Sequence, residues 1–316
     1  MYTYYVGLDM GGTKLKAAVL DEGYQIIKTF YCTPQNEKTT REMCSEEWKK
    51  LITPYLAELE QEYHALPSAF GISTPGIPKK DHTAIGHMPE RLTDIQGLDW
   101  SELLKYPGKI YTVNDAKAAF IGEIQADELK HIKNICMLTL GTGVGGAAKV
   151  DGILLEGNIG RAGHLGNMSV DMEGRQALTG IPGGLDNLVG NCQISERTHG
   201  LYDDPLGLEM DYVKGDPAAV EYWLKMVKAL AVGIASLINI LDPEIMIIGG
   251  GIANAGKNLF GPLKRYLDLY EWRPYGIPTK IIPAANGDFS GAIGAAIFAH
   301  AWQLHIDSGS NGQLVI

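Results

Sequence analysis

The chain has 316 residues, of which 39 are glycine, about 12% against the roughly 7% of an average protein. With 45% apolar residues it is globular, and its length exceeds what one hydrophobic core usually serves, so we expect two domains. A net charge of −10 and the lack of any basic run exclude broad binding to nucleic acids.

The first third of the chain alternates apolar runs with turns. Residues 4–8, 15–20 and 25–30 are apolar, with DMGGTK at 9–14 and Asp-Glu-Gly at 21–23 between them. This pattern predicts an antiparallel β-meander with a glycine turn between its first two strands. Residues 40–66 have helical spacing that Pro54 interrupts. Further on, the pattern predicts strands over 69–73 and 110–114 and a helix over 115–126.

Residues 136–152 repeat the plan of the N-terminus about 130 residues later, with a strand, a glycine loop at 141–146, a second strand and a turn. This similarity suggests a duplicated domain, and the alternative is a chance likeness between short strands.

The last third of the chain alternates helices and strands. Asp216 is a good helix N-cap and Pro217 suits the first turn, so a long helix is expected up to 241. The remaining pattern predicts a strand over 244–248, a helix over 254–269, a strand over 279–282 and a helix over 290–305. Strands alternating with helices indicate an α/β fold. We place the first domain at 1–115 plus 290–316 and the second at 116–289.

Two further observations concern the cellular location of the protein and its cysteines. No apolar stretch reaches about 18 residues without a polar interruption, and the N-terminal residues lack the features of a signal peptide. We therefore expect a cytoplasmic protein with no membrane partner. The four cysteines are scattered, which indicates neither a disulfide framework nor a cysteine zinc site.

Two glycine loops are candidate phosphate-binding sites. In DMGGTK, backbone amides can face an anion while Asp9 offers a carboxylate to magnesium. The loop GTGVGG at 141–146 leads into a strand, so it is not a dinucleotide-binding loop, and no Walker motif is present. Two such loops can clasp one polyphosphate, although a glycine turn after a strand is also a common plain hairpin.

Five motifs resemble, in order and spacing, those of the ROK family of sugar kinases and repressors. They are DMGGTK at 9–14, NDAKAA at 114–119, GTGVGGA at 141–147, GNIGRAGHLGN at 157–167 and PEIMIIGGGIA at 243–253. The resemblance covers nearly the whole chain. It implies two duplicated actin-like ATPase (ribonuclease H-like) domains around a central nucleotide cleft, with ATP and Mg²⁺ as cofactors, a small sugar or polyol as substrate, and a homodimer.

The resemblance also implies roles for individual residues. Asp115 matches the catalytic base, and Asn114 matches a ligand for substrate hydroxyls; helix capping is the alternative role for Asp115. Asp9 would act on the magnesium side, through water. The expected ATP and phosphate contacts are Asp9, Gly11, Gly12, Thr13, Lys14, Gly141, Thr142, Gly143, Gly249, Gly250 and Gly251.

The acceptor motif departs from the family pattern. His164 stands where the family commonly has Glu, and Asn167 where it has His. The zinc cysteines are missing from 177–186, where Asp186 is a shorter substitute for a final Glu, so we predict no zinc site. We expect His164, Asn167 and Asp186 to contact an acceptor other than plain glucose; for His164 the alternative is a packed loop histidine. Lys117 replaces a usual Asn, either as a solvated lysine or as a contact to a polar or anionic part of the acceptor.

The leading hypothesis is an ATP-dependent carbohydrate kinase that phosphorylates a hydroxyl of a sugar, amino sugar, cyclitol or similar polyol. One alternative is a ROK-type sensing regulator, which lacks support because the first strand begins within a few residues of Met1 and leaves no room for a DNA-binding domain. Another is a catalytically silent sugar-binding protein, against which the two glycine loops and Asp115 argue.

Overall fold

The structure is a computed structural model that describes residues 3–11, 14–33, 43–88, 92, 94–176, 179–309 and 314–316. The contacts between residues divide the chain into two compact units. Unit 1 comprises Met1–His131, Ile153–Ala162 and Ala285–Ile316, and unit 2 comprises Ile132–Gly152 and Gly163–Ala284.

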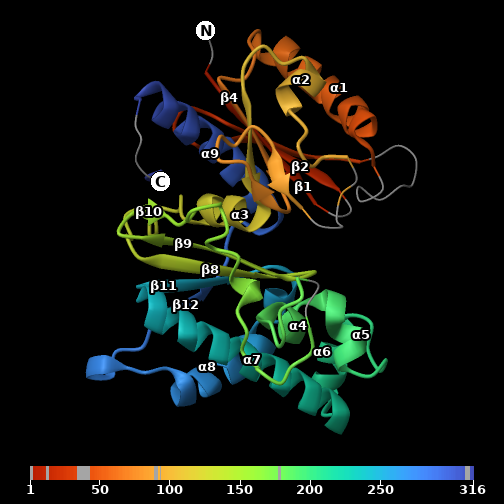
Figure 1. The fold of residues 1–316 in the computed structure, drawn as a ribbon, viewed down its shortest axis with the longest axis vertical. Coiled ribbons are helices and arrows are strands. Elements are labelled where there is room, and N and C mark those ends of the chain that lie inside the picture. The colour runs from red at the N-terminus through yellow and green to blue at the C-terminus, as the bar shows by residue number, and fades with distance from the viewer. Residues whose placement is uncertain are drawn as a thin grey trace. The chain divides into compact units, whose positions relative to one another are not determined.

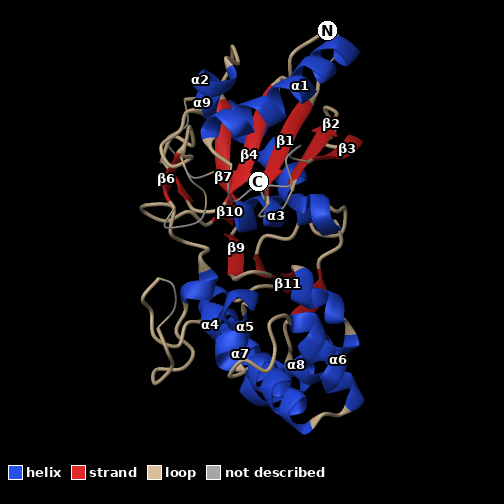
Figure 2. Cartoon of the chain, turned by 90° about the vertical axis from the view of Figure 1, so that its right-hand side faces the viewer, coloured by secondary structure: helices blue, strands red, loops and turns tan. Residues whose placement is uncertain are grey.

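Unit 1 is built on a five-stranded mixed sheet with the order β3-β2-β1-β4-β7 (Figure 2). Its first three strands form the predicted meander, and β1, β4 and β7 are parallel. The strands are β1 (Tyr5–Met10), β2 (Leu15–Leu20), β3 (Ile26–Cys32), β4 (Ala69–Thr74) and β7 (Ile110–Asn114), with the small pair β5 (Ile77–Pro78) and β6 (Ile85–His87) beside them. The helices are α1 (Ser45–Tyr63), α2 (Trp100–Leu104), α3 (Asp115–Glu123) and α9 (Ser290–Asp307), with a short 3-10 turn over Gly287–Phe289.

The two faces of this sheet are covered differently. On one face, large apolar side chains of α1 and α2, among them Trp48 and Trp100, form the core with the strands. On the other face α9 lies directly on β1 and β4 (Figure 1). A Cβ atom at Gly7 or Gly71 would overlap backbone atoms of α9, so glycine permits this close approach.

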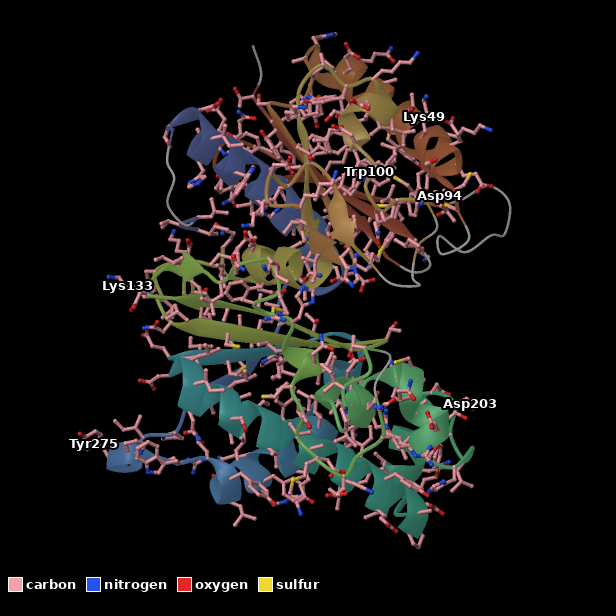
Figure 3. The ribbon with its side chains drawn as sticks, viewed as in Figure 1. Lys49, Asp94, Trp100, Lys133, Asp203 and Tyr275 are labelled. Atoms are coloured by element: carbon pink, nitrogen blue, oxygen red, sulfur yellow. The ribbon has the colours of Figure 1, made fainter. Side chains whose placement is uncertain are left out.

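Unit 2 is built on a sheet with the order β10-β9-β8-β11-β12. Its strands are β8 (Ile135–Leu140), β9 (Val144–Val150), β10 (Ile153–Leu154, which belongs to unit 1 by its contacts), β11 (Ile245–Gly249) and β12 (Lys280–Pro283). Its helices are α4 (Leu185–Val189), α5 (Ile194–Arg197), α6 (Pro205–Lys214), α7 (Pro217–Leu241) and α8 (Lys257–Tyr270). Short 3-10 turns cover Leu165–Asn167, Asn191–Gln193, Gly251–Ala255 and Pro274–Gly276. On the last of these, Tyr275 is fully exposed at the periphery of unit 2 (Figure 3).

Helix α7 begins and ends as predicted, with Asp216 as its N-cap. Among the described helices it is the only one long and apolar enough to cross a membrane by those two criteria. Its buried side chains, however, include Trp223, Leu230 and Ile234, which pack inside unit 2. This packing is that of the central helix of a domain core.

The two sheets share one topology. In each, a central strand (β1 or β8) pairs antiparallel with the strand that follows it and parallel with a later strand (β4 or β11), which in turn pairs parallel with the edge strand (β7 or β12). Each glycine loop connects the first two strands of its sheet. The duplication inferred from the sequence is therefore present in the fold.

Two expectations differ from the structure. Pro54 does not interrupt its helix, because α1 continues from Ser45 to Tyr63 with Trp48, Ile52 and Leu59 buried on one face. The predicted domain boundary at residue 115 also differs from the contact-based division, which keeps α3 in unit 1. The reason is that α3 packs along α9, where a Cβ at Gly294 would overlap the carbonyl group of Ala118.

Candidate functional site

Asp9 lies near the carboxyl end of β1, next to the carboxyl end of β4. The hydroxyl of Ser73 donates a 2.6 Å hydrogen bond to Oδ1 of Asp9. Burial raises the pKa of Asp9 to about 6, against the lowering effects of Ser73 and Lys16, and the charges of Asp115 and Asp288 raise it further. A half-buried carboxylate close to other carboxylates is a favourable place for a divalent cation.

The first glycine loop begins with a tight turn, in which the amide of Gly11 donates to the carbonyl of Asp9 at 3.1 Å. Lys14 is exposed, and its ammonium lies 5.1 Å from the centre of the Tyr31 ring. Gly12 and Thr13 lie outside the described residues. The phosphate-binding role of this loop therefore stays a prediction.

Asn114 and Asp115 stand at the junction of β7 and α3. Oδ1 of Asn114 accepts hydrogen bonds from the amides of Ala116 (3.1 Å) and Lys117 (3.2 Å), so Asn114 is the N-cap. The alternative that Asp115 is the cap is wrong, because Asp115 is the first residue of the helix. The amide group of Asn114 donates to the carbonyl of Gly76 (3.1 Å) and to Oδ1 of Asp115 (3.0 Å).

Asp115 is half-buried and held through one oxygen. Oδ1 accepts from the amide of Ala116 (2.8 Å) as well as from Asn114. This arrangement fixes the orientation of the carboxylate at the carboxyl end of a parallel strand, the edge of an α/β sheet where ligands usually bind. The geometry suits a general base, and the role itself stays a prediction.

Lys117 is not the solvated lysine that we considered. It is 1% exposed, and its ammonium lies 3.4 Å from Oε1 of Glu156 and donates to the carbonyl of Gly160 at 3.4 Å. Burial lowers its pKa, which Glu156 partly opposes. The sequence does contain a signal: α3 reads DAKAAFIGE and has hardly any polar face on which a lysine could be solvated.

Glu156 and His82 are functional candidates that the sequence reasoning missed. Nδ1–H of His82 donates to the carbonyl of Thr112 at 2.8 Å, and Nε2 lies 3.2 Å from Oε2 of Glu156. Burial alone would raise the pKa of Glu156, but hydrogen bonds and charges from His82 and Lys117 outweigh it and lower the pKa to about 2. No motif links positions 82, 117 and 156, so only the fold brings them together.

In unit 2, residues that come later in the chain hold the second glycine loop in place through hydrogen bonds. The amides of Asn191 and Cys192 donate to the carbonyls of Gly141 and Thr142, each at 2.9 Å. Oδ1 of Asp186 accepts from the amide of Val144. The carboxylate expected to bind the acceptor thus supports the loop, and its acceptor contact stays a prediction.

Arg197 braces the same region and was not singled out from the sequence. Its guanidinium is buried and donates to the carbonyls of Asn187 (3.4 Å), Val189 (3.3 Å) and Gly190. Burial lowers its pKa to about 10. These carbonyls come from the end of α4, directly before the residues that bind the glycine loop.

His164 directly precedes the short turn Leu165–Asn167, which Asn167 ends and which packs against β9. Both are half-buried, and the hydroxyl of Thr179 donates to Oδ1 of Asn167 at 2.8 Å. The structure thus places both residues in one loop of unit 2, while their contact with an acceptor stays a prediction.

The described parts of the loop that follows, residues 168–176 and 179–184, are held by backbone pairing. Amides of Leu185, Val170 and Gly183 donate to carbonyls of Met168, Gly183 and Arg175 at 2.8–2.9 Å. Gly183 has a positive φ of 59°, and a Cβ there would overlap the carbonyl of Asp171. In the described part of the chain no three His, Cys, Asp or Glu residues group to hold a metal. The lack of zinc stays a prediction.

Gly249 ends β11, and Gly250 and Gly251 lead into the turn Gly251–Ala255. Gly250 lies against the backbone of Leu140, the last residue of β8 before the second glycine loop. The two glycine segments of unit 2 are therefore neighbours, and the adenosine-side role of residues 249–251 stays a prediction.

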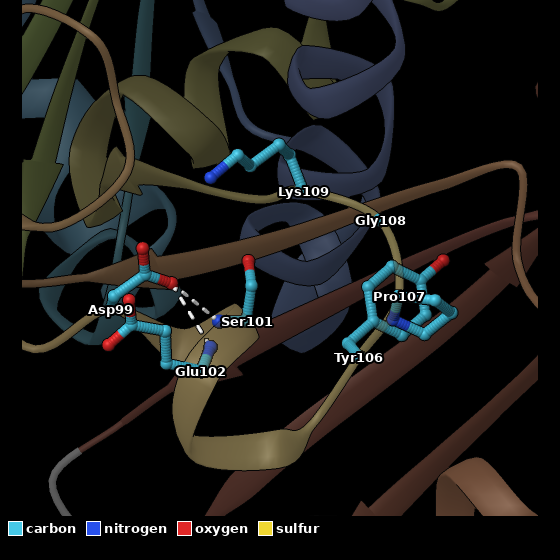
Figure 4. Close-up of a pocket in the computed structure, with 7 residues that line it drawn as sticks. All are labelled: Asp99, Ser101, Glu102, Tyr106, Pro107, Gly108 and Lys109. Carbon is cyan, nitrogen blue, oxygen red and sulfur yellow. Dashed lines mark hydrogen bonds between the residues drawn. The ribbon is translucent and has the colours of Figure 1, made fainter.

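A shallow hollow of about 370 Å³ lies elsewhere in unit 1, lined by residues of α2 and of the turn before β7 (Figure 4). Within it, Oδ1 of Asp99 accepts from the amides of Ser101 (2.8 Å) and Glu102 (3.2 Å) as the cap of α2. The hollow is at the amino end of β7, whereas Asp115 follows its carboxyl end. It is not the site that the motifs describe.

The two sheets have the same strand order, and each has a glycine loop after its first strand. In unit 1, carboxylates lie at the carboxyl ends of the strands. Together these features define the actin-like ATPase class. The model of the ROK family matches residues 5–302, and the chain belongs to this family. It is 29% identical to the glucokinase of Thermotoga maritima, covering 92% of this chain and 95% of that one. It is 28% identical to the N-acetyl-D-glucosamine kinase of Yersinia pseudotuberculosis, covering 94% and 98%. The crystal structure of the ROK hexokinase of Thermus thermophilus is similar to this chain, with 25% sequence identity and a TM-score of 0.79. The match covers 97% of this chain and 100% of that one.

Proposed function

We propose that the protein transfers the γ-phosphate of ATP to a hydroxyl of a sugar or related polyol, with Asp115 as general base. The ROK family and its sugar-kinase relatives define the enzyme class, a carbohydrate kinase. The observation that carries the proposal is the fixed carboxylate of Asp115 at the carboxyl end of β7. Phosphoryl transfer needs mainly positioning, charge neutralisation and one carboxylate aimed at the attacking hydroxyl.

Magnesium would be held on the Asp9 side. Mg²⁺ retains several waters and usually takes one or two carboxylates together with substrate phosphates. Asp9 fits this pattern because it is half-buried near other carboxylates, and a cation would offset the desolvation cost that raises its pKa. When bound, the ion would neutralise charge on the phosphates. The residue's contribution is to hold a water-bound cation beside the first glycine loop.

The nucleotide contacts proposed in unit 2 are Gly141, Thr142 and Gly143, with Gly249, Gly250 and Gly251 on the adenosine side. The loop 141–143 has amides and one hydroxyl that can bind phosphate oxygens. Its support by Asn191, Cys192 and Asp186 gives it a defined shape before the nucleotide arrives. Such preorganised amides are effective at stabilising charge that develops during the transfer.

The acceptor is proposed to be a sugar, amino sugar or cyclitol other than plain glucose. Imidazole at position 164 can donate a hydrogen bond, which a Glu carboxylate cannot, and Asn167 can both donate and accept. Asn114 and Asp186 complete the proposed contacts. Glucose as the fastest substrate would contradict this assignment.

The test is ADP release from the purified protein with ATP and Mg²⁺ across a panel of sugars, amino sugars and cyclitols. We expect turnover with at least one acceptor, and loss of roughly 10³-fold or more in Asp115→Asn with the ATP dissociation constant within about threefold. Asp127→Asn is the control, since this exposed Asp pairs with Lys130 at the surface. Binding of a sugar without ADP release would instead favour a silent sugar-binding protein.

We also propose a cytoplasmic homodimer. Leu206, Met210 and Val213 of α6 are each more than half exposed and, at this spacing, lie on one face of the helix. An apolar stripe of this kind is typical of a surface that another protein covers. Light scattering on the wild type and on Met210→Glu tests this, and a monomeric mass for the wild type would contradict it.

A further inference from the structure

Lys117, Glu156 and His82 form a buried ionic cluster inside unit 1, here called the buried triad. Both ring nitrogens of His82 face oxygen atoms that can only accept, the carbonyl of Thr112 and the carboxylate of Glu156. Glu156 thus supplies one carboxylate to two basic side chains, those of Lys117 and His82, which are almost completely buried.

An arrangement of this kind depends on its single anion. Buried charges are costly unless paired, and removing one partner leaves the others without compensation. Glu156 uses one carboxylate oxygen for each basic side chain, Oε1 for Lys117 and Oε2 for His82. Loss of the Glu156 carboxylate would leave the buried ammonium of Lys117 and the ring of His82 without their common acceptor, which favours release of the segment that carries residue 156.

That segment, residues 153–162, leaves β9 and belongs to unit 1 by its contacts. At its start, Leu154 donates its amide to the carbonyl of Leu314 at 3.2 Å, and Ile153 forms an isolated bridge with Val315. Its middle is held by the buried triad, since Lys117 reaches both the carboxylate of Glu156 and the carbonyl of Gly160. The segment supplies the first half of the acceptor motif at 157–167.

The partners of the segment come from the elements that carry Asp115. Lys117 lies on α3, two residues after Asp115, and Thr112 lies on β7, three residues before it. His82 is itself tied to β7, because the amide and the hydroxyl of Thr112 donate to its carbonyl at 2.6 and 3.1 Å. The triad thereby connects the segment to the strand and the helix on both sides of the proposed base.

We propose that Lys117, Glu156 and His82 are positioning residues that hold segment 153–162 in fixed register with Asp115, and so set the affinity for the acceptor sugar. The triad does not touch the reacting atoms in this proposal, because its members bond to one another and to the backbone. This inference rests on the proposed kinase function. It predicts an effect on acceptor binding that is separate from the rate of transfer.

The test combines hydrogen exchange with kinetics in three variants, Glu156→Gln, Lys117→Met and the double variant. In both single variants we expect exchange of the amides in 153–162 to rise about tenfold or more. The KM for the fastest acceptor of the panel should rise about tenfold, while kcat and the KM for ATP stay within about threefold.

The double variant separates positioning from stability. It removes one cation together with the anion, so the thermal stability lost in Glu156→Gln should be largely recovered. The segment stays untied, so the acceptor KM should remain raised. A merely structural triad would restore stability and acceptor KM together, and that outcome overturns the proposal.

The control is Glu62→Gln, which removes a carboxylate from an exposed ion pair of unit 1, 3.1 Å from Lys28. It should leave exchange of 153–162 and all kinetic constants unchanged. Unchanged exchange in Glu156→Gln overturns the proposal, as does raised exchange with an unchanged acceptor KM. Hydrogen exchange needs no turnover, so failure of the kinase function itself is recognised separately, by the absence of ADP release in the wild type.

Discussion

The side-chain amide of Asn114 donates a 3.0 Å hydrogen bond to Oδ1 of Asp115, while Oδ1 of the same Asn114 caps α3. One side chain therefore both starts the helix and orients the carboxylate of its first residue. The two tasks can be separated by substitution, since a cap needs only an acceptor and the carboxylate needs a donor.

Asn114→Asp keeps the cap and loses the donor. We expect its free energy of unfolding to fall by less than about 1 kcal/mol, because Asp and Asn are equivalent caps, while kcat falls by roughly 10²-fold as two carboxylates repel. Asn114→Ala should lose both, with about 1–2 kcal/mol of stability removed. Urea unfolding and ADP release measure the two effects, and equal kcat in Asn114→Asp and wild type would contradict the orienting role.

The carboxyl group of Glu156 should titrate far below an ordinary glutamate. Its pKa is about 2 in the folded protein against 4.5 for an ordinary glutamate, so its stabilising effect is complete above pH 4.5 and lost as the pH falls toward 2. Lys117→Met should raise this pKa and shift the loss to higher pH. Carbon-13 titration of the glutamate carboxyl groups measures it, and a value near 4.5 in the wild type would exclude the ionic triad.

Gly71→Ala should be severely destabilising, by about 3 kcal/mol or more, because the new methyl group would overlap the backbone of Ala295 in α9. Gly261→Ala is the matched control. Gly261 lies inside α8 with open space around it, so alanine should stabilise by about 0.5–1 kcal/mol. Thermal unfolding of both variants gives the comparison, and similar stabilities for the two would show that α9 does not lie this close to β4.

Arg197→Lys should weaken ATP binding although residue 197 is proposed to touch no nucleotide. Lysine cannot reach the three carbonyls that the guanidinium binds, so we expect about 2 kcal/mol less stability and a several-fold higher KM for ATP. Arg175→Lys, at an exposed ion pair with Glu196, should change stability by less than about 0.5 kcal/mol. An unaltered KM for ATP in Arg197→Lys would show that bracing of the glycine loop does not depend on this side chain.

The elements that could be predicted from the sequence are those whose apolar pattern and turn residues lie close together in the chain. The meander around DMGGTK, the capped helix after Asp216 and the strand 244–248 each have their apolar period and their turn residues within a short window. These features need no information from distant parts of the chain.

The contacts between side chains of the site could be predicted less well from the sequence. The Lys117–Glu156 pair spans 39 residues, and the His82–Glu156 pair spans 74. The apolar sequence around Lys117 indicates a buried lysine, but no local pattern identifies the distant carboxylate that it meets. Pro54 was misjudged for a similar reason, since the packing of Trp48, Ile52 and Leu59 maintains α1 despite the missing backbone donor.

The placement of α9 has a consequence for synthesis of the protein on the ribosome. The sheet of unit 1 is complete once residue 114 has been made, but the helix that covers one of its faces begins only at Ser290. Unit 2 ends at Ala284 and can close earlier. The face of the sheet that carries Gly7 and Gly71 therefore stays uncovered until the last helix has been synthesised. Chaperones have their longest opportunity to bind the chain during this interval.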